Sequence, residues 1–175
     1  MKNKKKTAAL TLKKLVISAM LTAIGVVIGI VCKTFLDFGG VFRITFENLP
    51  IIMSGILFGP LVGGMVGATV DIISALNAGQ APLPFVMVGS ICVGVVSGVM
   101  AKYVVKTKGK KQIIFSAAAA HLIGSMIIKP IALFAIYQWA VLFRIPIYMV
   151  IAPIEIILLC LLFKNKSFCR VTEYY

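Results

Sequence analysis

The sequence predicts an all-α integral membrane protein with six transmembrane helices and both termini in the cytoplasm. Hydrophobic residues make up 61% of its 175 residues, and its mean hydropathy of +1.06 is far above that of soluble domains. Most basic residues stand between the apolar runs in three clusters, and short basic segments of membrane proteins stay in the cytoplasm. The clusters are Lys2, Lys4, Lys5, Lys6, Lys13 and Lys14; Lys102, Lys106, Lys108, Lys110 and Lys111; and Lys164, Lys166 and Arg170. Both termini and the internal cluster are then cytoplasmic, so the chain must cross the membrane an even number of times before the internal cluster and an even number of times after it.

Each predicted helix is an apolar run that approaches the roughly 20 residues needed to span a bilayer. The first covers Leu15–Val31. The second, Ile44–Phe58, is short and ends at the turn residues Gly59-Pro60, and the third, Leu61–Leu76, follows directly, so these two form a tight hairpin. The last three helices cover Pro84–Val104, Gln112–Lys129 and Pro146–Phe163, and the outer connections are 32–43, 77–83 and 130–145.

The chain is expected to form a single membrane domain over residues 1–175, with a basic cytoplasmic segment at 1–14 and a cytoplasmic tail at 164–175. No small-x-small cleavage site follows the first apolar run, which favours an uncleaved helix over a signal peptide. The four cysteines lack paired spacing, so neither a disulfide nor a metal site is predicted. The net charge of +13 flanks the spans without interleaved aromatic residues, which favours membrane topology over nucleic-acid binding.

Pairs of small residues four positions apart occur on three of the predicted helices. Close packing of helices in lipid needs such pairs, because lipid provides no hydrophobic drive between helices. The pairs are Ala19/Ala23 and Gly25/Gly29 on the first helix, Gly63/Gly67 on the third and Gly94/Gly98 on the fourth. Any one pair is expected to serve ordinary internal packing. The first helix carries two pairs, however, so one of them could serve a partner protein.

Four cations stand outside the basic clusters and are expected on the outer side or within the bilayer. A cation at that depth costs about 2.5–3.5 kcal/mol and is usually functional. They are Lys33, Arg43, Lys129 and Arg144. Glu47 and Asp71 each lie twelve residues from Gly59, on opposite sides of it, so helical rise places both carboxylates about 18 Å from the bend. Charges at one depth indicate a shared polar cavity that opens to the outside.

Two alternatives need no cavity. Arg43 is four residues from Glu47, a spacing that permits an ion pair on one helix at the membrane interface. Lys129 could extend its ammonium group to the lipid headgroups.

In the inner half of the predicted bundle, His121 and Glu155 both lie about 12 Å from the cytoplasmic ends of their helices. We therefore expect these two to approach each other or share a polar partner, as a structural bridge rather than a proton relay.

The sequence argues against catalysis. It has one His, no HExxH motif and no nucleophile elbow. Glu47 and Asp71 could form the acid/base pair of a small membrane enzyme that acts on lipid phosphates, but the acidic metal cluster that most such enzymes use is missing. The sequence also has no ATP-binding loop, so any pumping must use the ATPase of another protein, and no cofactor is expected on this chain.

A run of residues through the second and third helices resembles the substrate-binding S components of energy-coupling factor (ECF) vitamin transporters. The run is Arg43-Ile-Thr-Phe46-Glu-Asn-Leu-Pro50, then Gly55, Phe58-Gly59-Pro60, Gly63, Gly67 and Asp71. The six-helix length, the basic ends and Ala19-x-x-x-Ala23 match as well, so the resemblance covers the whole chain. Within the family the chain is most similar to the folate group, although it has Glu47-Asn48-Leu49 where many folate members carry apolar or aromatic residues.

The resemblance implies an S-component-like bundle in the bacterial plasma membrane that binds a vitamin, with folate as the expected substrate, under a cap of outer loops. Riboflavin, pantothenate and a queuosine precursor are the alternative substrates. It also implies a monomeric S component within a hetero-complex that contains a membrane-embedded coupling subunit and two cytoplasmic ATPases, which hydrolyse the ATP. Ala19 and Ala23 match the motif by which the first helix docks on the coupling subunit.

Folate suits the residues that are predicted to line the polar cavity. Its glutamate tail carries two carboxylates, which Arg captures well, and its flat pterin ring has a hydrogen-bonding edge and two faces for aromatic contact. The candidate substrate-binding residues are the cations Arg43, Lys129 and Arg144, the polar residues Glu47, Asn48, Asp71 and Gln138, and the aromatic residues Phe46, Phe85, Tyr137 and Trp139.

Overall fold

The structure, a computed structural model, describes residues 2–38, 42–79, 81, 83–105, 109–138, 144–165 and 168–169; at 2–11, 38, 42–43, 132, 135–137 and 144–145 it describes the backbone alone. The helices are α1 (Lys2–Phe35), α2 (Asn48–Phe58), α3 (Pro60–Asn77), α4 (Pro84–Val99), α5 (Lys110–Ala120), α6 (Lys129–Tyr137) and α7 (Arg144–Lys164). Two π-helical segments complete two of the spans. The first, η1 (Met100–Val104), extends α4, and the second, η2 (His121–Ile128), joins α5 to α6 without a break.

The predicted all-helical fold holds apart from one short hairpin. Strands β1 (Asp37–Phe38) and β2 (Phe42–Arg43) pair antiparallel directly after α1. The N–H of Ile44 then donates to the carbonyl of Leu36 at 3.1 Å, which extends the pairing by one residue. For this reason the second helix begins at Asn48 and not at Ile44 as predicted.

Five helical stretches are long and apolar enough to cross a membrane. They are Leu12–Phe35, Pro60–Asn77, Pro84–Val104, Lys110–Ile131 and Pro146–Lys164. α2 has 11 residues and is therefore only about 16 Å long, roughly half of the 30 Å hydrocarbon core of a bilayer. The second predicted helix is thus present, but within the described ranges only five stretches are full spans rather than the six predicted.

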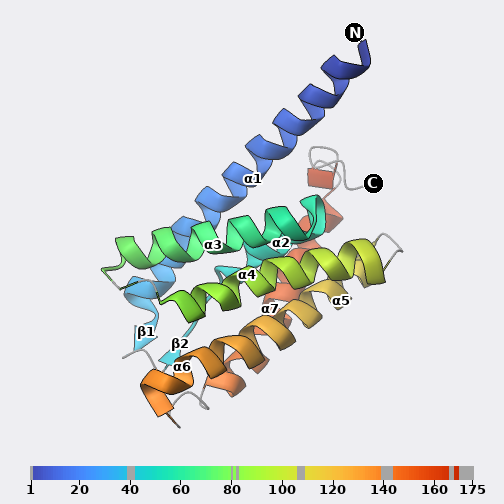
Figure 1. The fold of residues 1–175 in the computed structure, drawn as a ribbon. Helices are drawn as coiled ribbons and strands as arrows, with labels where there is room; N and C mark the ends of the chain where they lie inside the picture. The colour runs from blue at the N-terminus through green and yellow to red at the C-terminus, as the bar shows by residue number, and fades with distance from the viewer. Residues whose placement is uncertain are drawn as a thin grey trace.

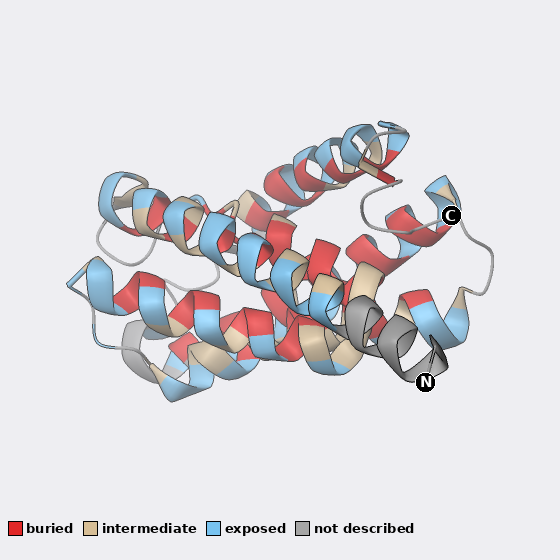
Figure 2. Ribbon diagram, turned by 90° about the horizontal axis from the view of Figure 1, so that it is seen from above, coloured by how far each residue is buried: buried red, intermediate tan, exposed pale blue. Residues whose placement is uncertain are grey.

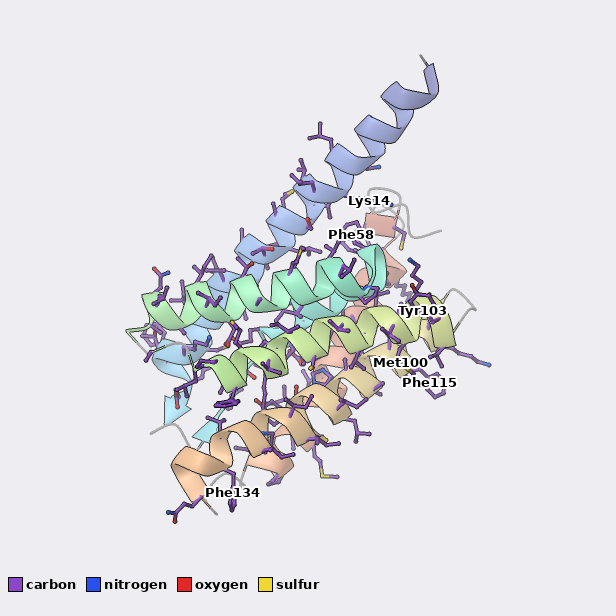
Figure 3. The ribbon with its side chains drawn as sticks, in the orientation of Figure 1. Lys14, Phe58, Met100, Tyr103, Phe115 and Phe134 are labelled. Carbon is purple, nitrogen blue, oxygen red and sulfur yellow. The ribbon has the colours of Figure 1, made fainter. Side chains whose placement is uncertain are left out.

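The helices run back and forth between two ends of the molecule (Figure 1). The start of α1, the turn between α2 and α3 and the end of α7 lie toward one end, while β1, β2 and α6 lie toward the other. Buried residues face neighbouring helices and exposed ones face outward (Figure 2). Large apolar side chains such as Phe115 and Phe134 project from the outer surface (Figure 3), as lipid-facing residues do.

Glycines set the distance between α3 and α4. A Cβ atom on Gly63 would lie 2.5 Å from the carbonyl oxygen of Gly94, and one on Gly67 would meet the carbonyl oxygen of Ser90. Gly98 packs equally closely against the backbone of Pro60. The small pairs of these two helices therefore serve packing inside the bundle, as expected for helices in lipid.

The two small pairs of α1 lie on different faces. A Cβ atom on Gly29 would lie 2.8 Å from the Cβ of Ser74, and Gly25 packs against α3 one turn earlier. Ala19 and Ala23, by contrast, are exposed. α1 also buries the smallest share of its apolar span, 22%, against 33–50% for the other four full spans. The alanine face of α1 is therefore open to lipid or to another protein.

Substituting Gly63 with alanine is expected to push α3 and α4 apart, because the added methyl group would meet the rigid backbone of Gly94. Overpacking of this kind costs about 1–3 kcal/mol, which should lower the thermal midpoint in detergent by about 5 °C. The neighbouring substitution Gly64→Ala is the control. Its Cβ would lie 3.0 Å from a methyl group of Val95, a side chain that can move. Equal losses in both variants would contradict this account of the packing.

Candidate functional site

Four charged side chains, which we call the charged cluster, meet in the interior of the bundle. They are Lys33 of α1, Glu47 just before α2, Asp71 of α3 and Lys129 of α6, and these residues are 3%, 3%, 4% and 2% exposed. Two positive and two negative charges balance one another within the cluster. Balance matters because an uncompensated charge at bilayer depth is expensive. Three of the four, Glu47, Asp71 and Lys129, are residues that the sequence predicted for the site.

Lys33 ties α1 to α3. Its Nζ donates to Oδ1 of Asp71 at 2.9 Å, to the carbonyl oxygen of Asp71 at 3.1 Å and to Oγ of Ser74 at 2.6 Å. The same Nζ lies 3.6 Å from Oε2 of Glu47. The ammonium group therefore uses its donors on α3 and faces the carboxylate that precedes α2. Hydrogen bonds that involve charged groups are shorter and stronger than neutral ones.

Lys129 occupies the other side of the same carboxylate. Its Nζ donates to Oδ1 of Asn48 at 3.1 Å and lies 3.9 Å from Oε1 of Glu47. Nδ2 of Asn48, in turn, approaches Oγ of Ser125 in η2 at 3.4 Å. Asn48 is fully buried and uses both ends of its amide within the protein. The polar contacts therefore run from α1 and α3 through the start of α2 to η2 and α6.

Two glycines make room for this polar layer. A Cβ atom on Gly29 would lie 3.0 Å from Oε2 of Glu47, so that the carboxylate rests directly against the backbone of α1. A Cβ on Gly89 would lie 2.5 Å from Cγ of Lys129, whose methylene chain passes over α4 at this point. Gly29 therefore has a role in the site as well as in the packing of α1 on α3.

The predicted approach of His121 and Glu155 is confirmed. Nε2 of His121 lies 2.9 Å from Oε2 of Glu155, and the two residues are 1% and 0% exposed. The pair joins η2 to α7. A buried pair of this kind makes poor evidence for stability, because removing two groups from water offsets much of their attraction.

Three other predicted site residues, Phe46, Phe85 and Gln138, have described side chains that are more exposed than the charged cluster. Phe85, the second residue of α4, is 72% exposed, and Gln138 is exposed directly after α6 with a positive φ of 50°. Phe46 is half-buried just before α2. In the present conformation, neither Phe85 nor Gln138 is enclosed by the bundle.

Four further predicted residues are described in part or not at all. Arg43 lies in β2, Tyr137 ends α6 and Arg144 begins α7, with their side chains outside the described atoms, and Trp139 falls outside the described residues. The alternative in which Arg43 and Glu47 pair along one helix does not apply, because neither residue is helical. β2 instead contacts α7.

Sequence reasoning missed the central position of Lys33. A signal was present, because this residue is one of the four cations outside the basic clusters. Its partners, however, are Asp71 and Ser74, which lie 38 and 41 residues further along the chain. Ser74 and Ser125 carry no such signal, since serines in apolar helices ordinarily bond to their own backbone.

The fold and the site define a polytopic membrane protein that holds a balanced set of charges in its interior, as membrane proteins that handle polar solutes do. The chain belongs to the family of ECF transporter substrate-specific components, whose model matches residues 13–170. The family resemblance predicted from the Arg43–Asp71 run is therefore confirmed. Members of this family are substrate-binding subunits of transporters, so the chain is a transport protein and not an enzyme.

Two comparisons place the chain among known proteins. The crystal structure of FolT bound with folic acid is similar in fold, with a TM-score of 0.61 and 20% sequence identity over 82% of this chain and 89% of that chain. A protein of Mycoplasma pneumoniae, described as an uncharacterized protein MG098 homolog, is 29% identical over 91 residues. That match covers 52% of this chain but only 19% of the relative, so the chain spans a small part of that longer protein.

Proposed function

We propose that this protein binds folate, or a reduced folate, and delivers it to an ATP-driven importer. One observation carries the choice of folate over other vitamins: the chain shares its fold over most of its length with FolT, which was crystallised with folic acid. The family fixes the general role, and the chemistry of the site has to accept the particular ligand.

The charged cluster has no net charge, so cations beyond it must hold the two carboxylates of a folate tail. Lys33 and Lys129 already face Glu47 and Asp71. We therefore assign the carboxylates mainly to Arg43 in β2 and Arg144 at the start of α7, since arginine binds carboxylates in a bidentate manner. The contact between β2 and α7 supports a joint role for these two elements.

Asp71 is suited to read the edge of the pterin ring. Lys33 binds its Oδ1, and its side chain is 6% exposed, which is more than the other three side chains of the cluster. A carboxylate held in place by an internal cation accepts hydrogen bonds from a ring that presents N–H donors. The aromatic candidates Phe46, Phe85, Tyr137 and Trp139 would supply ring contacts, and Gln138 a further polar contact, once the outer segments close over the ligand.

The proposal extends to topology and partners. We assign a single membrane domain in a bacterial plasma membrane, with both termini, the 1–14 segment and the 164–175 tail in the cytoplasm, because the basic clusters would then all lie inside. The protein would act as one S component beside a membrane-embedded coupling subunit and two cytoplasmic ATPases. The exposed alanines Ala19 and Ala23 would form its docking face.

Equilibrium binding to the detergent-purified protein tests the proposal. Folic acid is expected to bind with a nanomolar Kd, equivalent to about −12 kcal/mol, and to co-purify in a form visible in the absorbance spectrum. Pteroate, which lacks the glutamate tail, should bind at least about tenfold more weakly, the equivalent of one lost charged contact. Tight binding of riboflavin, pantothenate or a queuosine precursor in place of folic acid would overturn the choice of substrate.

A further inference from the structure

The π-helical segment η2 links the His121–Glu155 pair to the charged cluster. It begins at His121 and ends directly before Lys129. The backbone hydrogen bonds change their spacing across this segment. The N–H of His121 donates to the carbonyl of Ala117, four residues earlier, whereas that of Lys129 donates to Gly124, five residues earlier. The hydrogen-bond spacing of the helix, which we call its register, is therefore four residues at the start of η2 and five at its end.

This change of register determines where Lys129 and Ser125 point. A π-helical turn closes over five residues rather than four, so it rotates every later residue relative to the earlier ones. In an α-helix, successive residues are about 100° apart, so a return of η2 to the α register would turn Lys129 by up to roughly that angle, and Ser125, in the middle of η2, by less. Both side chains contact Asn48 in the present register, Lys129 at 3.1 Å and Ser125 at 3.4 Å.

Contacts with three neighbouring helices hold η2 in this register. Ser125 meets Asn48 of α2. Gly124 lies against α4, where an added Cβ would be 3.0 Å from the backbone nitrogen of Val93. His121 pairs with Glu155 of α7 at the start of the segment. π-helical turns are rare and occur often at functional sites, so a segment of eight residues indicates that these contacts maintain it.

We propose that Glu155 is a positioning residue for ligand binding. By holding His121 it keeps η2 in its π register, and η2 then places Lys129 beside Asn48 and Glu47 in the substrate site. Glu155 itself does not touch the ligand. This inference rests on the proposed function, in which the charged cluster that contains Lys129 forms part of the folate site through Asp71.

A double-mutant cycle with folic acid as the probe separates positioning from a general structural role. Glu155→Ala is expected to weaken binding about tenfold, and Lys129→Ala by a similar factor. The double variant should bind no more weakly than Lys129→Ala alone. Glu155→Gln retains an acceptor oxygen for His121 and should recover most of the affinity. The control Leu159→Ala removes a buried apolar side chain one turn along α7 and should lower the thermal midpoint without changing the Kd.

A second measurement needs no ligand. In a background without the native cysteines, Asn48→Cys and Ser125→Cys should be joined by a short bifunctional thiol reagent when Glu155 is present and should not be joined with Glu155→Ala. Unchanged cross-linking, or additive losses of affinity in the cycle, would overturn the positioning role. If folic acid does not bind at all, the proposed function is at fault, and the cross-linking still decides whether Glu155 sets the register. If Lys129→Ala leaves the affinity for folic acid unchanged, the positioning role is overturned.

Discussion

Replacing Lys33 with alanine is expected to abolish folate binding and to cost about 3–5 kcal/mol of stability. The ammonium group binds the carboxylate and carbonyl of Asp71 and the hydroxyl of Ser74, and it faces Glu47 at 3.6 Å. Without it, Asp71 loses the cation that compensates its charge in the interior of the bundle. Thermal unfolding in detergent and equilibrium binding of folic acid measure the two effects.

Two further variants show whether charge compensation is the cause. Lys33→Met combined with Asp71→Asn removes both charges, so it should recover most of the stability while folate binding stays weak, because an amide offers fewer acceptors to the ligand than a carboxylate. Lys14→Ala removes an exposed lysine from α1 and should change neither quantity. If the double variant is as unstable as Lys33→Ala, compensation of Asp71 does not explain the role of Lys33.

Replacing Ala19 with tryptophan is expected to stop transport completely while leaving folate binding intact. Ala19 is exposed on α1, away from the charged cluster, so the larger side chain leaves the site unchanged. Close approach of a partner helix, however, requires small residues on this face. ATP-dependent uptake of folate into liposomes that contain the complete transporter measures the first effect, and the Kd of the isolated protein measures the second.

Leu61→Trp is the matched control for this experiment. Leu61 is 79% exposed on α3 and lies outside the alanine face of α1, so tryptophan there should leave both uptake and binding unchanged. A loss of folate binding in Ala19→Trp would mean that this face of α1 packs inside the protein. Retained uptake would mean that another surface docks on the proposed coupling subunit.

Much of the fold is predictable because lipid leaves the backbone few choices. Every peptide group inside the hydrocarbon must be paired within its own segment, so a long apolar run there forms a helix. The same constraint explains why the glycine pairs of α3 and α4 mark real contacts. The depth of a residue along its membrane-spanning helix is also predictable, because each residue rises about 1.5 Å. For this reason the prediction that His121 and Glu155 approach each other is correct.

The parts that the sequence does not reveal depend on contacts between distant segments or on local departures from the α-helix. The pairing of Lys33 with Asp71 joins two helices whose relative rotation no local pattern specifies. The hairpin that delays α2 to Asn48 rests on two short strands with no strong alternation of apolar and polar residues. The π register of η2 depends on its neighbours, so the direction of Lys129 could not be derived from spacing alone.

The short length of α2 bears on how a bound solute would leave the protein. Its amino end, beside Glu47, is separated from the turn at Gly59 by 11 residues, or about 16 Å. With the turn at Gly59 on the cytoplasmic side, as proposed, a solute bound beside Glu47 would be separated from that side by about 16 Å of protein, roughly half of the bilayer's apolar thickness.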